Sequence, residues 1–212
     1  MTLLSGELRE ALKDYKYLLN RGYSREVALN VISSRYFLNE LQRLLLYRCV
    51  HSEEEISQVR KKMVQEKEVV IDGFNVAITL LNAIDNDMAF LCDDGLIRDL
   101  GLGKKKGDNR VLDVLILFSE YCEWKGIVFE ILLDSQVSHS GEIANELRRR
   151  GIRALTTTKT DKEVILRNKA VVSNDFVVAM KAKKVANLLL DFLKDSNIPL
   201  VEISSLLGRE NI

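Results

Sequence analysis

The sequence is poor in the two residues that interrupt helices, and this shortage predicts the structure of its first part. Of the 212 residues only Pro199 is a proline, and no glycine occurs between Gly22 and Gly73. Because Gly and Pro disfavour helix interiors most strongly, we expect residues 23–72 to be largely helical. Ser52 followed by Glu55 is typical of a capping box at a helix start. We interpret residues 1–66 as a small helical domain.

Cysteines, long apolar runs and an excess of charge are also lacking. The cysteines, Cys49, Cys92 and Cys122, are odd in number and widely spaced, which argues against a secreted disulfide framework. No apolar run reaches the ~18 residues of a membrane helix, and the start lacks a basic segment followed by an apolar core. We therefore expect a cytoplasmic protein without membrane contact. Equal numbers of basic and acidic residues, 31 of each, argue against a strongly basic nucleic-acid coat protein.

From residue 67 onward, short apolar runs alternate with helical segments. Near-continuous apolar runs are typical of strands buried on both faces, and their alternation with helices indicates a parallel α/β sheet. We therefore expect residues 67–212 to form one α/β domain. The link 85–109 is rich in glycine and lysine and is expected to be a long mobile loop. Asp93 and Asp94 are interpreted as solvated turn residues, with loop acids that reach the cleft at the sheet edge as the alternative. The strand-like runs are 69–71, 127–133, 152–155, 170–172 and 198–203.

Four aspartates follow the expected strands. Asp72, Asp134 and Asp175 each end a strand-like segment, and Asp161 opens the helix after the run 152–155. Because the carboxyl ends of parallel strands lie along one edge of a sheet, we expect these side chains to converge on one cleft. Such carboxylates raise one another's pKa values unless a cation lies among them, and their oxygens suit Mg²⁺ or Mn²⁺. Taken singly, each aspartate is better explained as a turn former or helix cap, whereas all four along one edge favour a metal cluster.

Three segments resemble a known superfamily. VVIDGFNVAITL, TDKEVI and AVVSNDF are together similar to the PIN-like nucleases, in particular to their NYN branch. That branch has a first strand ending in Asp-Gly-x-Asn, a later acidic step and a final strand ending in Ser/Thr-x-Asp. Asp72 and Asn75, then Asp161, then Asp175 occupy these places. With LLDSQVSHSGEIANELRRRGI and GYSREVALNVISSRYFLNELQRLLLYR, the chain also resembles an uncharacterised archaeal family that joins a helical domain to a PIN-like domain.

The resemblance implies a three-layer, Rossmann-like PIN fold and a metal-dependent ribonuclease. The four aspartates would hold one or two Mg²⁺ or Mn²⁺ ions for phosphodiester hydrolysis, and Asn75 would position the attacking water. PIN-like domains carry a further acid in a central helix, for which Asp113 and Glu120 are the candidates. The alternative is an inactive adaptor of this fold that binds RNA or a ribonucleoprotein. A haloacid-dehalogenase-type phosphatase is disfavoured, because Phe74 stands where its second acid belongs.

RNA is the expected partner, and basic or polar segments are the candidates for contacting it. Basic clusters suit the phosphate backbone and helix starts can hold a phosphate, but solvated faces and plain caps explain the same residues. The helical half is the expected contact for a second copy of the chain or a ribonucleoprotein partner; its arginines and tyrosines favour either RNA stacking or core packing. The candidates are Lys104, Lys105, Lys106, Arg110, Ser138, His139, Ser140, Arg148 and Arg149, and in the helical half Arg35, Tyr36, Arg43, Tyr47 and Arg48.

Overall fold

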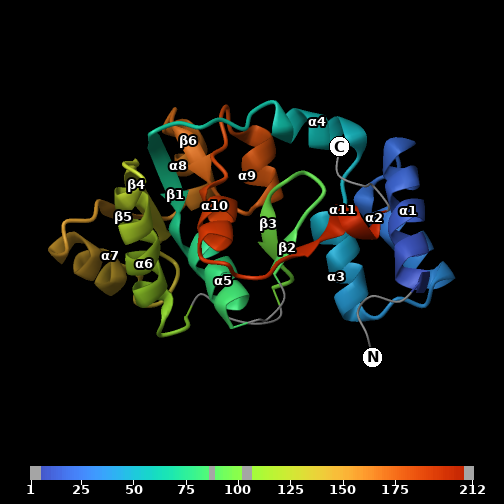
Figure 1. The fold of residues 1–212 in the computed structure, drawn as a ribbon, viewed down its shortest axis with the longest axis horizontal. Helices are drawn as coiled ribbons and strands as arrows, with labels where there is room; N and C mark the ends of the chain where they lie inside the picture. The colour runs from blue at the N-terminus through green and yellow to red at the C-terminus, as the bar shows by residue number, and fades with distance from the viewer. Residues whose placement is uncertain (1–5, 86–88, 102–106, 208–212) are drawn as a thin grey trace.

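Two β-sheets organise the molecule (Figure 1). The computed structural model describes residues 6–85, 89–101 and 107–207. The larger sheet has four parallel strands in the order β5-β4-β1-β6, so the expected α/β class with a parallel sheet is confirmed. Its strands are β1 (Glu68–Asp72), β4 (Val128–Asp134), β5 (Ala154–Thr157) and β6 (Ala170–Val172).

Helices cover both faces of this sheet. Successive strand residues point to opposite faces, so Val69 and Ile71 pack into one apolar core and Val70 into another. The first core also contains side chains of the helices α5 (Gly73–Ile84), α6 (Val111–Trp124), α7 (Ser140–Arg149) and α10 (Leu188–Asp195). The second contains side chains of α8 (Thr160–Leu166) and α9 (Phe176–Lys181). Helix, sheet and helix therefore form three layers, and no described helix is long and apolar enough to cross a membrane.

An N-terminal helical region precedes the parallel sheet; its first three helices lie at the other end of the molecule, whereas the fourth packs through Val59 into the second core (Figure 1). The expected capping box is confirmed, because Ser52 and Glu55 each accept a hydrogen bond from the other's backbone N–H. Gly22 has a φ of +83°, which suits glycine and lets the chain turn after the first helix. The region consists of α1 (Gly6–Asn20), α2 (Arg25–Arg35), α3 (Glu40–Cys49) and α4 (Glu53–Arg60).

A second, three-stranded sheet lies between these two parts and corrects two expectations. It contains β2 (Ala89–Leu91), β3 (Ile97–Asp99) and β7 (Val201–Glu202), which is followed by α11 (Ile203–Leu206). The link 85–109 is thus not simply a loop, since β2 and β3 form a buried antiparallel hairpin. The run 198–203 supplies only β7, which pairs with β2 and not with the parallel sheet.

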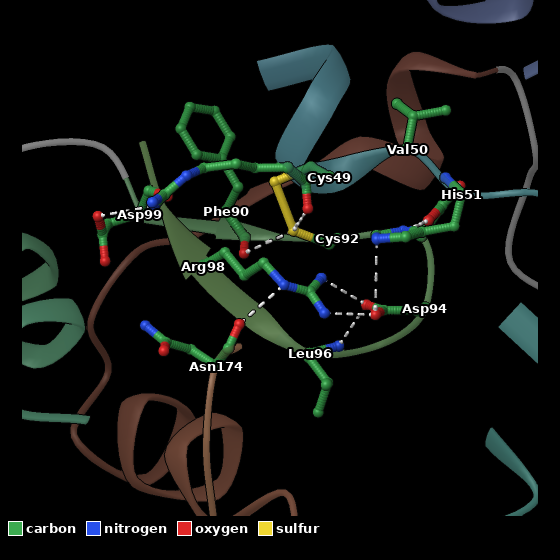
Figure 2. The surroundings of a disulfide bond; sticks show 12 residues. Cys49, Val50, His51, Phe90, Cys92, Asp94, Leu96, Arg98, Asp99 and Asn174 are labelled. Atoms are coloured by element: carbon green, nitrogen blue, oxygen red, sulfur yellow. Dashed lines mark hydrogen bonds and ion pairs between the residues drawn. A yellow bond between two sulfur atoms is a disulfide. The ribbon is translucent and has the colours of Figure 1, made fainter. Parts of the chain in front are cut away.

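A third apolar core joins the helical region to this second sheet. Phe90 and Cys92 from the hairpin and Ile203 from α11 pack among apolar side chains of α1, α2 and α3. A disulfide between Cys49 and Cys92 also joins the end of α3 to the hairpin (Figure 2). This single bond was not foreseen from the cysteine spacing, which argued only against a framework of several.

Reduction of this disulfide is expected to lower the free energy of unfolding by about 4 kcal/mol, because the bond joins residues 43 positions apart and so restricts the unfolded chain. Guanidinium unfolding with and without dithiothreitol measures the change, and in a Cys92→Ser variant dithiothreitol should have no effect. Burial raises the pKa of the remaining thiol, Cys122, to about 12. This buried thiol is therefore titrated after the protein is unfolded without a reductant. One reactive thiol is expected, and three would contradict the disulfide.

Candidate functional site

The order of the strands marks one position along the sheet edge as the expected ligand site. From β1 the chain goes to β4 and β5 on one side and then returns to β6 on the other side of β1. The helices after β1 and β6, α5 and α9, lie on opposite faces of the sheet. In open parallel sheets ligands bind in the crevice at such a switch point. Asp72 ends β1, and Asp175 follows β6 by three residues.

Asp72 is held firmly at this point. The residue is only 3% exposed, and Oδ2 of its carboxylate accepts hydrogen bonds from Asn75 Nδ2 at 2.6 Å and from Ser173 Oγ at 2.9 Å. The Ser173 hydroxyl in turn accepts from the backbone N–H of Asp175 at 3.2 Å. Asp175 caps α9 by accepting from the N–H of Val178 at 2.9 Å. One hydroxyl thus connects Asp72 to the Asp175 segment.

Gly73, the first residue of α5, lies where this helix packs closely against β4. Helix α5 begins directly behind β1. A Cβ atom on Gly73 would lie 2.6 Å from Leu133 Cδ2 and 2.7 Å from Ile131 Cγ2, closer than packed atoms can approach. Any larger residue here would force the Leu133 and Ile131 side chains to move, so glycine suits this helix start, and Asn75 then reaches back to Asp72 within the first turn.

Further polar contacts extend from the switch point to the second sheet and the helical region. Asn174 Nδ2 donates to the Asn75 carbonyl at 3.2 Å and also to Thr79 Oγ1. The Thr79 hydroxyl donates to Asp99 Oδ2 at 2.7 Å. Asp99, on β3, accepts from Arg48 of α3 through its carbonyl at 2.8 Å and through Oδ1 at 3.4 Å. One chain of contacts thus runs from Asp72 to the helical region.

A pocket of about 620 Å³ opens beside this chain of contacts. Of the residues expected to be functional, Asn75, Asp175, Tyr47 and Arg48 line it, and Asp72 lies directly behind Asn75. Other lining residues are not predicted from the sequence, because they come from the hairpin, from the start of α2, or from positions beside Asp175 in AVVSNDF to which the motif gives no role. They are Arg25, Arg98, Asp99, Asn174 and Phe176.

Arg98 belongs to a buried ion pair that fixes one wall of the pocket (Figure 2). Its Nη1 and Nη2 bind the two Asp94 oxygens at 2.9 and 2.6 Å, and its Nε donates to the Asn174 carbonyl at 2.9 Å. Burial by itself raises the pKa of the Asp94 carboxyl, but Arg98, His51 and the N–H of Leu96 outweigh it and hold that pKa below its usual range. The expectation that Asp93 and Asp94 are solvated is wrong: they are 5% and 0% exposed.

The structure does not bring all four aspartates together. Asp134 accepts from the N–H of Gln136 at 2.9 Å and so supports the turn after β4. Asp161 is exposed at the start of α8, beyond β5. Helix α8 follows the edge strand β5, whereas Asp175 follows the opposite edge strand β6. Within residues 6–85, 89–101 and 107–207, no three His, Cys, Asp or Glu side chains are grouped to hold a metal.

The expected helix acids and RNA contacts lie elsewhere. Asp113 and Glu120 are exposed on α6. Ser138, His139 and Arg149 line a second pocket of about 610 Å³, which shares no lining residue with the first. Most remaining candidates contact other parts of the chain. Arg110 pairs with Asp85 and Asp108, Arg148 donates to the Ala154 carbonyl, and Ser140 is buried at the start of α7. In the helical region, Tyr36 donates to Asp14, Arg35 lies near Asp14, and Arg43 donates to Asn30, whereas Lys104, Lys105 and Lys106 lie outside the described residues.

Comparison with known proteins assigns both parts of the chain. The profile described as "Domain of unknown function (DUF5616)" matches residues 61–191, more than half of the chain. The chain belongs to this family. The DUF5616 match contains the whole parallel sheet and both Asp72 and Asp175, whereas the profile "Protein of unknown function (DUF434)" matches residues 7–62, the helical region.

A relative shows that the two parts occur together in another protein. The uncharacterized protein MJ0935 of Methanocaldococcus jannaschii is 34% identical to this chain over 189 residues, which cover 84% of this chain and 91% of the relative. No solved structure matches the chain.

Proposed function

We propose that the protein is a metal-dependent ribonuclease of PIN-like type, with its site at the switch point between β1 and β6. The observation that carries the proposal is the position of Asp72, a buried carboxylate that accepts from Asn75 and Ser173 behind a pocket lined by Asn75 and Asp175. The parallel sheet, with Asp72 at the end of β1 and Asp175 shortly after the neighbouring strand β6, supports the resemblance to the PIN-like fold.

Two carboxylates at neighbouring strand ends, Asp72 and Asp175, are the donor type and number that one divalent ion would need. Mg²⁺ is commonly bound by one or two carboxylates, with water and substrate phosphate completing its shell. Asp72 and Asp175 would hold the ion, while Asn75 and Ser173 keep Asp72 in place through their hydrogen bonds to its Oδ2. The chemistry supplied by such an ion is charge stabilisation at a phosphodiester and activation of water. Asn75, which lines the pocket, would orient the attacking water.

The second candidate is an RNA- or ribonucleoprotein-binding adaptor without catalytic activity. It is favoured by the spread of the four aspartates over the sheet edge and by the absence, within the part of the chain that is described, of any group of three metal-capable side chains. The same pocket, with its arginines and its Tyr47 and Phe176 rings, would then bind RNA and leave it intact.

Metal removal separates these two functions. We expect the purified protein to cleave labelled single-stranded RNA in Mn²⁺ or Mg²⁺, to stop in EDTA because the phosphate charge is then no longer stabilised, and to resume when excess Mn²⁺ is added. Filter binding run in parallel should show that EDTA leaves RNA bound. Binding without cleavage in any metal would establish the adaptor in place of the nuclease, and a protein that neither binds nor cleaves RNA would contradict both.

A further inference from the structure

Arg48 is the pocket arginine that presents its charge to the opening. Its side chain is 40% exposed, against 19% for Arg25 and 4% for Arg98. The guanidinium of Arg98 is engaged by Asp94 and Asn174, as described above. The guanidinium of Arg25 donates to two backbone carbonyls at the end of α3 and pairs with Glu55 at 3.0 Å. Of these three arginines, Arg48 is therefore the one placed to meet an anion.

The surroundings of Arg48 restrict its position. Its Nη1 donates twice to Asp99, a residue that is only 3% exposed. Its guanidinium also packs against Gly101, where a Cβ atom would lie 3.1 Å from Nη2 and 3.3 Å from Cζ. A side chain already held in one place loses less conformational entropy when a ligand binds to it. The helical region thus delivers a positioned cation to the pocket.

Arg48 is also connected to the proposed catalytic residues. Asp99, which holds Arg48, accepts from Thr79, and Asn174 contacts both Thr79 and Asn75. Arg48 and Asp72 therefore stand at the two ends of one chain of hydrogen bonds. The planar guanidinium fork matches the oxygens of a phosphate.

We propose that Arg48 binds a backbone phosphate of the RNA next to the bond cleaved at Asp72, so that the helical region forms part of the substrate site. The identity of the polymer as RNA rests on the proposed function. The contribution of Arg48 is measured by binding, which requires no cleavage.

The test compares two arginines of the same helix. Arg48→Gln removes the charge but keeps a donor for Asp99, and Arg43→Gln makes the same change at a half-buried position whose contact is Asn30. Binding of fluorescent single-stranded RNA is measured in EDTA over a series of KCl concentrations. We expect Arg48→Gln to weaken binding roughly 10-fold and to lower the slope of log K against log salt by about 0.7, the value for one phosphate contact on a single strand. Arg43→Gln should leave the slope unchanged.

The outcomes separate this proposal from the proposed function. Equal slopes for Arg48→Gln and the wild type overturn the role of Arg48, whether or not the protein cleaves RNA, and a wild type that binds no RNA overturns it as well. Binding that depends on Arg48 without any cleavage supports it while refuting the nuclease. If Arg48→Gln does not fold by circular dichroism, Arg48→Lys decides: it keeps the cation but loses the fork, so a roughly 3-fold weaker affinity is expected and wild-type affinity contradicts the proposal.

Discussion

Replacing Asp72 by Asn is expected to lower the rate of metal-dependent RNA cleavage by at least roughly 100-fold and to leave the fold intact. Asparagine has nearly the same shape and can still accept from Ser173 or Asn75, but it lacks the charge that would hold the ion. Losing about 3 kcal/mol of transition-state stabilisation corresponds to that factor. Single-turnover cleavage with saturating RNA and fixed Mn²⁺ measures the chemical step without interference from product release.

Asp161→Asn is the matched control for this prediction. It makes the same change at an exposed aspartate of α8, the helix that follows the opposite edge strand, and should leave the rate within about twofold, since Asp161 is not assigned to the ion in the proposed site. Both variants are purified in the same way as the wild type, so equal cleavage by all three proteins would reveal a contaminating nuclease and contradict the proposal. A similar loss in both variants would instead indicate that Asp161 shares the site.

The sequence predicts the part of this site that depends on local pattern. Asp72, Gly73 and Asn75 are neighbours in the chain, so a strand end followed by a helix start already implies their proximity. The pairing of Asp72 with the Ser173 segment follows from the expectation that all strand ends share one edge, and the structure agrees. The separation of Asp161 could not be foreseen, because strand order depends on which strands pair, and apolar runs carry no such information.

The hairpin was missed for a different reason. The glycines and lysines of the link 85–109 favour a loop, although Asp94-Gly95 between apolar residues is a strong hairpin signal, and Gly95 has a φ of +93°. Asp93 and Asp94 were expected in solvent because buried charges occur only with partners. Those partners are distant in sequence: Lys16 and His51 bind Asp93 across 77 and 42 positions. Contacts of this kind follow from the tertiary structure and cannot be inferred from composition.

Replacing Arg98 by Met is expected to lower the free energy of unfolding by roughly 3–5 kcal/mol at neutral pH. The substitution leaves the Asp94 carboxylate buried without the guanidinium that binds both its oxygens, and an uncompensated buried charge is among the costliest defects in a protein. Guanidinium unfolding measures the loss. Arg35→Met removes an exposed arginine with one long ion pair to Asp14 at 3.7 Å and should change stability by less than about 0.5 kcal/mol.

The pH dependence of the free energy of unfolding distinguishes a buried unpaired charge from lost packing. In the wild type the pKa of Asp94 is lowered on folding, so its ion pair stabilises the protein above the usual carboxyl range, and this contribution is lost as the pH falls through the folded pKa. In Arg98→Met burial raises that pKa instead, and a protonated Asp94 needs no cation. The difference in stability between variant and wild type should therefore narrow as the pH falls through the carboxyl range.

A double variant provides the control. Asp94→Asn combined with Arg98→Met contains no buried unpaired charge and should recover part of the lost stability at neutral pH. A deficit that is the same at every pH, with no recovery in the double variant, would mean that Arg98 acts only through packing.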